Sequence, residues 1–433
     1  MNQQAVLDGS NPVDLFTSLP LELKREICEY LCDHCKTTIP QHEAFKPRYA
    51  PLASLCLASR ALRDAAEPVL YHLFFYQYGQ RQERLEPFSK TLLQGPDLAA
   101  HIRRIRYEPE PWDDYNDESE ALEGSLETTS AIENLRLHRS LFDLVLSRAE
   151  NLEELSIQIE GGWRMPLVDL PRLRDLHLQQ PELWTPPSLT YPKGERGLNT
   201  APLLERLWLD KWSLFDVAHH DLLDLVSHVH KLSIQPDSEG YGSLEDNIKI
   251  IVKALPKLTS FDFFDEHLGV TPQFELLSRL LVRKDSLTDI YIETDVLYID
   301  LDLISRFANL KHLRLDCDMV FTLGAENEYK ILSSTLGVHR LPLPYSLETL
   351  WICPTQESSV WILVWLSLSL SQYVNLEYVR CISGRWDGDR AFQDEMTQML
   401  KEECVEENFR KANVRFDEVN CVGSCRSLVE SVL

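Results

Sequence analysis

A short pattern of alternating apolar residues, apolar-x-x-apolar-x-apolar, recurs along most of this 433-residue chain. Nine clear instances divide the 224 residues between Leu152 and Leu376 into eight intervals, with a mean of 28 residues. The alternation inside each instance predicts a short strand, and the segments between instances carry helical spacing. Strand and helix repeated in this way predict parallel strands stacked into a solenoid, whose units bury their apolar residues only against their neighbours. The instances begin at Leu152, Leu173, Leu204, Val229, Leu258, Leu287, Leu310, Leu347 and Leu376.

The repeats resemble leucine-rich repeats, whose period is roughly 20–29 residues. They depart from that family three residues after the last apolar strand residue, where the family has Asn or Cys and this chain has carboxylates. An Asn side chain donates and accepts hydrogen bonds between adjacent loops, whereas a carboxylate only accepts them. With intervals from 21 to 37 residues, we expect an irregular array; an ordinary α/β domain with accidental spacing is the alternative. The acidic positions are Glu160, Asp237, Glu266, Asp295 and Asp318.

In such a solenoid the parallel sheet lies on the concave face, and the residues between the strand leucines point toward it. Trp, Tyr and Arg are the residue types that most often anchor protein interfaces. A substrate with an acidic or phosphorylated group would meet Arg314 and Arg380, whereas the acidic strand-end positions would attract a basic one. The alternative is that a loop or the C-terminal helix covers these side chains. The predicted substrate-binding residues are Trp208, Tyr291, Arg314, Trp351, Tyr378 and Arg380.

The segment 14–76 lacks the repeat and shows helical spacing instead. Ser18 is a suitable cap for a first helix, on which Leu23, Ile27, Tyr30 and Leu31 form one apolar stripe. A second apolar stretch runs from residue 51 to 72, with Pro68 as a break or a helix start. Two or three short helices cannot bury all of their apolar surface by themselves. The segment is therefore predicted to dock onto a partner.

Residues 19–31 (L-P-L-E-L-K-R-E-I-C-E-Y-L) and 52–71 (L-A-S-L-C-L-A-S-R-A-L-R-D-A-A-E-P-V-L-Y) together resemble the F-box, especially that of fungal F-box proteins. The resemblance implies a subunit that docks onto the Skp adaptor of a Skp–cullin–F-box ubiquitin ligase. For each apolar residue of these two stretches, packing inside the helical module is the alternative to contact with the adaptor. The insertion 33–50 is longer than the family leads us to expect and could reshape the adaptor surface. The resemblance assigns adaptor binding to Leu19, Pro20, Leu23, Ile27, Leu31, Leu55, Leu57 and Arg60.

The expected fold is α/β, with an N-terminal helical F-box followed by an irregular leucine-rich-repeat solenoid. Residues 12–78 form the F-box, 79–150 a connecting segment with a first irregular repeat and an acidic loop, 151–388 the solenoid, and 389–433 a C-terminal cap and tail. The expected function is substrate recruitment to the ligase, with the Skp adaptor, the cullin complex and a protein substrate as partners. A leucine-repeat interaction scaffold without ubiquitin transfer is the alternative.

Composition excludes several other classes of function. The chain has 68 acidic and 43 basic residues, a net charge of −25, which disfavours direct nucleic-acid binding. Its longest apolar run, near 360–370, has about eleven residues, well short of the roughly 20 that span a bilayer. Ten scattered cysteines and the lack of a secretory leader favour the cytoplasm or nucleus. We expect no membrane contact.

No catalytic motif, such as a P-loop or G-x-S-x-G, is present in the sequence. We expect no enzyme activity and no cofactor. Cys28, Cys32 and Cys35 lie near His34 and His42, a combination that could bind zinc. Structural zinc usually takes two spaced pairs of ligands, and only one C-x-x-C is present here, so we favour thiols packed in a core and predict no metal.

Overall fold

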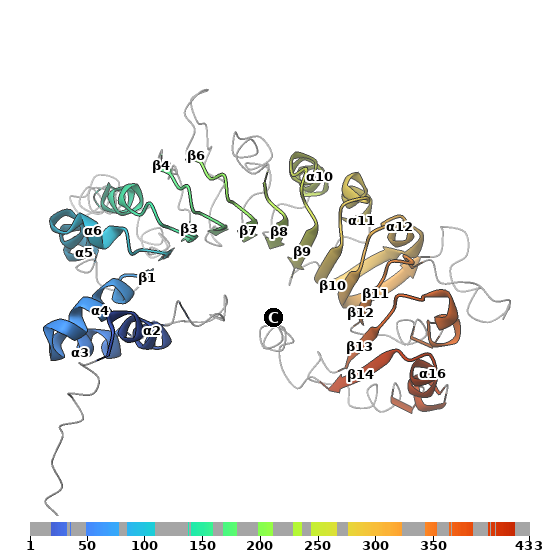
Figure 1. The fold of residues 1–433 in the computed structure, drawn as a ribbon. Coiled ribbons are helices and arrows are strands. Elements are labelled where there is room, and N and C mark those ends of the chain that lie inside the picture. The colour runs from blue at the N-terminus through green and yellow to red at the C-terminus, as the bar shows by residue number, and fades with distance from the viewer. Residues whose placement is uncertain are drawn as a thin grey trace, which may run out of the picture. The chain divides into compact units, whose positions relative to one another are not determined.

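In the computed structural model the chain forms two compact units (Figure 1). The first comprises Met1–Gln158 and Pro166–Leu173, and the second Ile159–Met165 and Arg174–Leu433. The described residues are 19–32, 35, 49–77, 85–108, 137, 140–158, 168–179, 198–210, 228–235, 244–265, 276–322, 343–352, 363–364, 366–383, 397–398, 400–402 and 404–420.

The first unit begins with three helices, α2 (Leu21–Leu31), α3 (Ala50–Ala58) and α4 (Arg60–Leu70). Helix α4 packs against both of the others. Their shared core combines thiols and small residues with Leu52, and the small residues let short helices approach closely. The buried members of this core, named the helical core below, are Cys28, Cys32, Leu52, Ala65, Ala66 and Val69.

The start of α2 differs from the sequence prediction. Pro20, not Ser18, occupies the N-cap position, and no side chain caps the helix there. A residue that precedes proline is disfavoured in the α-helical region, so Leu19 is kept out of the helix. The predicted cap at Ser18 is therefore wrong. Pro68 neither breaks nor starts a helix, because it lies inside the last turns of α4.

Ser59 separates α3 from α4 and caps the second of them. Its backbone is extended, and its Oγ accepts a hydrogen bond from the Leu62 backbone N–H at 3.2 Å. Loss of such a cap removes a partner from an N–H group that the helix itself cannot satisfy.

We expect Ser59→Ala to lower the free energy of unfolding by about 1 kcal/mol, as measured by urea denaturation. Ser54→Ala is the control, because Ser54 is exposed and only donates to the Ala50 carbonyl within α3. Alanine favours a helix interior, so this change should be neutral or slightly stabilising. Equal losses in the two variants would contradict the capping role.

The first unit continues with parallel strands β1 (Leu73–Gln77), β2 (Arg104–Glu108) and β3 (Glu154–Gln158), paired in that order. Helices α5 (Leu85–Gln94) and α6 (Pro96–Ala99) lie between β1 and β2, and the short β4 (Val168–Asp169) follows β3. Stacked rings of Tyr76, Tyr107 and Phe142 fill part of the core. Strand β1 was not anticipated, since its residues were assigned to the helical module.

The second unit is built on parallel strands that pair in the order β5-β7-β8-β9-β10-β11-β12-β13-β14. The predicted α/β class with a parallel sheet is confirmed. The strand bounds are β5 (Asp175–Gln179), β6 (Leu198–Thr200), β7 (Arg206–Asp210), β8 (Lys231–Gln235), β9 (Ser260–Asp265), β10 (Asp289–Asp300), β11 (His312–Thr322), β12 (Thr349–Ile352), β13 (Tyr378–Ser383) and β14 (Arg415–Asn420).

Two aligned rows of apolar side chains form the spine of this unit. All but the last residue of the first row, Phe416, are buried, because each strand places the same two positions against its neighbours. The first row runs through Leu176, Leu207, Leu232, Phe261, Ile290, Leu313, Leu350, Val379 and Phe416. The second runs through Leu178, Leu209, Ile234, Phe263, Ile292, Leu315, Ile352 and Cys381.

The helices of the second unit lie on the outer side of its strands in Figure 1. Helix α10 precedes β9, and α16 precedes β14. The helix bounds are α10 (Leu244–Ala254), α11 (Leu276–Leu280), η5 (Leu281–Arg283), α12 (Leu301–Ser305), η6 (Leu370–Gln372) and α16 (Val405–Lys411).

Asparagine side chains link successive repeats at the position directly before the first apolar residue of a repeat. Asn309 precedes the first apolar residue of its repeat and donates to the Asp285 carbonyl at 2.7 Å. Asn375 does the same to the Tyr345 carbonyl at 2.9 Å. In these two repeats the bridging amide is therefore placed before the strand.

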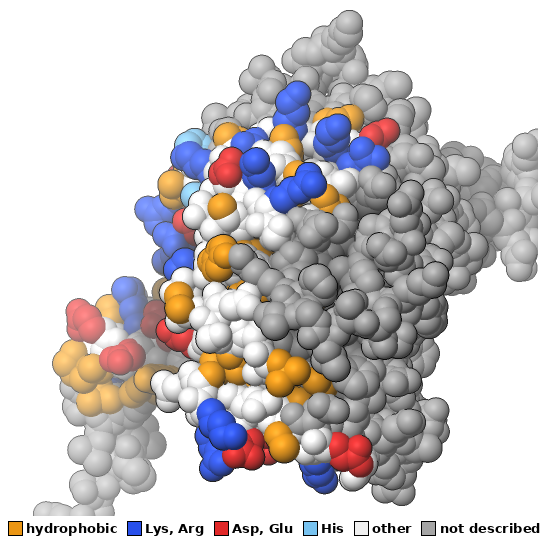
Figure 2. Space-filling model, turned by 90° about the vertical axis from the view of Figure 1, so that its right-hand side faces the viewer, with side chains coloured by type: hydrophobic (Ala, Val, Ile, Leu, Met, Phe, Trp, Pro, Cys, Tyr) orange, Lys and Arg blue, Asp and Glu red, His pale blue; other side chains and the backbone are white. Residues whose placement is uncertain are grey.

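Several predicted features lie outside the described residues. They include most of the 33–50 insertion, the acidic loop within 79–150, and the side chains of Glu160, Asp237, Glu266, Asp295 and Asp318. Within the described part of the chain, no helix is both long and apolar enough to cross a bilayer. Figure 2 shows one face on which, among the coloured side chains, basic and acidic groups are interspersed and hydrophobic groups form small clusters.

Candidate functional site

Helix α2 carries apolar residues on two faces, and only one of them is buried. Cys28 and Cys32 point into the helical core, with exposed fractions of 1% and 4%. Leu23 and Tyr30 lie on the other side and remain 45% and 72% exposed, with Ile27 half-buried between them. Two of the four residues of the stripe identified in the sequence, Leu23 and Tyr30, are thus exposed to solvent.

Helix α3 also carries an exposed apolar residue. Leu57 is 81% exposed at the end of that helix, and Arg60 is exposed just beyond it. Leu31 and Leu55 are half-buried against the helical core, so packing inside the module accounts for part of their burial. Leu19 is half-buried and Pro20 is exposed. We name the exposed residues Pro20, Leu23, Tyr30, Leu57 and Arg60 the helical docking surface.

The second unit brings the predicted substrate-binding residues into one row. Strand register aligns Trp208 with His177, Tyr291 with Arg314, and Trp351 with Arg380. These positions alternate with the buried spine residues, so their side chains share the opposite face of the strands. We name Trp208, Phe264, Tyr291, Arg314, Trp351, Tyr378 and Arg380 the aromatic–arginine row. That its members bind a substrate stays a prediction.

The first half of the row is held by contacts between rings. The Trp208 ring lies 5.3 Å from His177 on one side and 5.3 Å from Phe264 on the other, parallel to the latter. Phe264 in turn meets the Tyr291 ring edge-on at 5.0 Å. These geometries are the ones that the quadrupoles of aromatic rings favour.

The second half alternates rings with guanidinium groups. The Arg314 guanidinium carbon lies 4.2 Å from the centre of the Tyr291 ring and 4.8 Å from that of Trp351. Arg380 lies 4.9 Å from the same Trp351 ring, which is therefore held between two cations. Each such contact contributes roughly 0.5–1 kcal/mol at exposed sites and more where water is excluded. The row is thus a connected stack.

Asp417 gives the C-terminal end of the row a mixed charge. Its carboxylate accepts hydrogen bonds from Tyr378 Oη at 2.9 Å and from Arg415 Nη2 at 2.7 Å. Burial opposes ionisation, but these hydrogen bonds outweigh it and lower the pKa of Asp417 below its usual value. Burial and the hydrogen bond to Asp417 raise the pKa of Tyr378. Both groups keep their ordinary charges at neutral pH.

The C-terminal helix does not cover the row. In α16, Phe409 stacks on Phe416 of β14, with ring centres 5.1 Å apart. Phe416 is aligned with the spine residue Val379, whereas Asp417 is aligned with Arg380. Since neighbouring residues of a strand point to opposite faces, α16 packs on the spine side. Arg415 and Asp417, which were not among the predicted substrate-binding residues, extend the row at its C-terminal end.

Comparisons with known proteins add little to this description. No family model matches the chain, and no curated protein matches it. The chain is similar to a Bacteroides fragilis protein whose crystal structure was solved as a structural genomics target. The alignment covers 79% of this chain and 73% of the Bacteroides chain, with 12% sequence identity and a TM-score of 0.30. Similarity at this level carries no argument about function.

Proposed function

We propose that this chain is the substrate-recognition subunit of a Skp–cullin–F-box ubiquitin ligase. The observation that supports this most directly is the double-faced helix α2, whose thiols fill the helical core while Leu23 and Tyr30 stay exposed. Three short helices with an outward apolar stripe are suited to a partner that covers it. The resemblance of this segment to the F-box names the Skp adaptor as that partner.

In this proposal the chain forms and breaks no covalent bond. The helical docking surface binds the adaptor, which links the chain to the cullin and the ligation machinery. The repeat unit binds a protein substrate and so raises its effective concentration near the transferred ubiquitin.

The aromatic–arginine row supports a protein substrate with an acidic or phosphorylated group. Arg314, which is 9% exposed, and the half-buried Arg380 place their guanidinium groups against Trp351, and an arginine pair can bind carboxylate or phosphate oxygens with good geometry. Trp351 and Tyr378 supply apolar contact area beside them. A basic substrate would instead require the strand-end carboxylates, whose side chains lie outside the described residues.

Co-purification tests the adaptor half of the proposal. The full chain, co-expressed with a Skp adaptor from a fungus, should elute with it as a stoichiometric complex in size-exclusion chromatography. The double variant Leu19→Ala, Pro20→Ala should lose that complex. If the wild-type chain and the adaptor elute separately, the interaction scaffold without ubiquitin transfer becomes the better description.

Trp351→Ala tests the substrate half. We expect loss of the central ring to release both guanidinium groups and to weaken capture of specific partners by at least about tenfold, since aromatic anchors dominate interface energies. Quantitative pull-downs would compare this variant and Arg380→Ala with Tyr345→Ala, whose exposed ring (55%) belongs to the same unit but not to the row. An unchanged set of captured proteins in Trp351→Ala and Arg380→Ala would defeat the assignment.

A further inference from the structure

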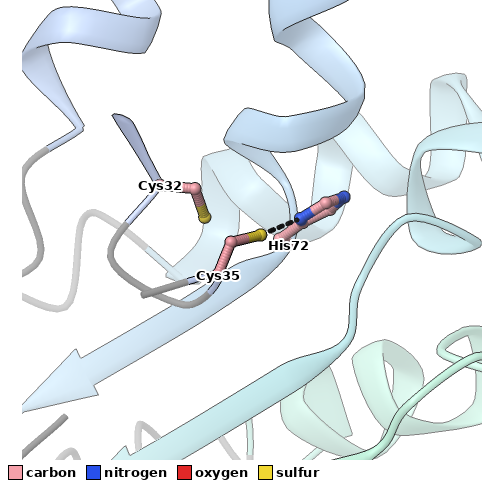
Figure 3. A group of neighbouring side chains, drawn as sticks. All are labelled: Cys32, Cys35 and His72. Carbon is pink, nitrogen blue, oxygen red and sulfur yellow. Dashed lines mark hydrogen bonds between the residues drawn. The ribbon is translucent and has the colours of Figure 1, made fainter. Parts of the chain in front are cut away.

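Two cysteines and a histidine from distant parts of the chain meet behind helix α2. Cys32 caps the C-terminus of that helix, Cys35 lies in the turn after it, and His72 follows α4 immediately before β1. Figure 3 shows the two thiols and the imidazole directed toward one another. Cys35 Sγ lies 3.3 Å from His72 Nδ1, and the ligand atoms of all three residues lie within 4.8 Å of one another.

These distances are close to those of a tetrahedral metal centre. Zinc bond lengths of about 2.3 Å to sulfur and 2.0–2.1 Å to nitrogen place neighbouring ligand atoms roughly 3.5–3.8 Å apart. The three atoms therefore need only small side-chain rotations to bind one ion. Thiolate and imidazole ligands favour Zn²⁺ over the hard cations Mg²⁺ and Ca²⁺.

The surroundings of the cluster also suit a metal. Cys32 and His72 are 4% and 8% exposed, while Cys35 is half-buried, so the site is closed on its inner side. His72 is held in place because its carbonyl accepts hydrogen bonds from the backbone N–H groups of Arg103 and Arg104, each at 2.9 Å. A preorganised imidazole lowers the entropic cost of binding.

In the metal-free site the Cys35 thiol is held in its neutral form. The side-chain hydrogen bond with Cys32, followed by burial, raises the pKa of the Cys35 thiol far above its ordinary value. A bound divalent cation reverses this preference, because it stabilises the thiolates and their protons leave to solvent. The same two cysteines and histidine can thus pack as part of a core without metal and act as a ligand set with it.

We propose that Cys32, Cys35 and His72 bind one Zn²⁺ ion that fastens the end of α2 to the junction between α4 and β1. Water would take the fourth coordination position, as in zinc sites with three protein ligands. This ion would hold α2, and with it the exposed Leu23 stripe, in a fixed orientation. The proposal departs from the sequence expectation of no metal and does not depend on the ligase function.

Metal titration of the purified full-length chain tests the proposal. The protein is kept reduced with a phosphine, stripped with a chelator and titrated with Zn²⁺ in a calorimeter. We expect one equivalent to bind and the Tm to rise by several degrees, since a ligand that binds only the folded state stabilises it. Titration with Co²⁺ should produce sulfur-to-cobalt charge-transfer absorption, which reports thiolate ligands independently of folding.

Matched variants locate the site. Cys35→Ser and His72→Gln should weaken Zn²⁺ binding by at least about tenfold, because each removes a direct ligand. Cys56→Ser is the control, since Cys56 is also half-buried against the helical core but lies outside the cluster. Unchanged binding in Cys35→Ser, or equal loss in Cys56→Ser, would overturn the proposal. If Cys35→Ser does not fold, absence of the cobalt charge-transfer band in the wild-type chain would overturn it.

Discussion

Replacing Leu57 by lysine is expected to weaken binding of the Skp adaptor by at least about 30-fold, which corresponds to about 2 kcal/mol. The Leu57 side chain is 81% exposed at the end of α3, so the free protein loses almost no packing from the change. In the complex an ammonium group would replace an apolar contact and would have to give up its hydration. Isothermal titration calorimetry or biolayer interferometry with purified adaptor measures the effect.

Leu93→Lys is the matched control for this substitution. Leu93 is 54% exposed and, like Leu57, is the last but one residue of its helix, here α5. A lysine near a helix C-terminus is compatible with the helix dipole in both cases. Both variants should therefore keep the wild-type Tm, and only Leu57→Lys should lose the adaptor. Equal affinity of the two variants would show that the helical docking surface does not bind there.

Phe263→Ala is expected to cost the second unit about 3–5 kcal/mol of unfolding free energy. Phe263 is fully buried in the second spine row, between Ile234 of β8 and Ile292 of β10. A solenoid unit is stabilised only by its two neighbours, so the cavity weakens the interfaces on both sides of β9. Urea denaturation followed by tryptophan fluorescence should show a lower midpoint for this unit.

Tyr345→Ala serves as the comparison, because it removes an aromatic ring that is 55% exposed in the same unit. Substitutions at such surface positions usually change stability by no more than about 0.5 kcal/mol. If Phe263→Ala shifted the midpoint no further than Tyr345→Ala does, the spine would not be the source of stability that we infer.

The strands were predictable because the spacing of the leucines in the sequence corresponds to the two apolar rows of the spine. Residues such as Leu232, Leu313 and Leu350 sit at positions that the period-two rule alone assigns to the interior. The same rule placed Arg314 and Trp351 on the opposite face. Strand β1 could not be found in this way, because L-F-F-Y-Q lacks the repeat spacing and directly follows a helix.

The helical segment was harder to predict, because two physical facts are invisible in its spacing. An apolar stripe on a helix normally marks the buried face, yet in α2 Leu23 and Tyr30 stay exposed, while Cys28 and Cys32 pack in the core as expected for these thiols. Likewise, Cys35 and His72 are 37 residues apart. Only the fold brings them together, so the sequence pattern around Cys35 indicated His34 and His42 as possible ligands but not His72.

If the aromatic–arginine row binds a substrate as proposed, the alternating stack around Trp351 bears on how fast that substrate binds. Arg314 and Arg380 are fixed against the same ring before any ligand arrives, so long flexible side chains need not be frozen during the encounter. Association should then proceed with little rearrangement, and differences among ligands should arise mainly in how slowly each one leaves. Because the residues of the row contact one another, a substitution that displaces one of them should also disturb the others and shorten the residence time of the ligand.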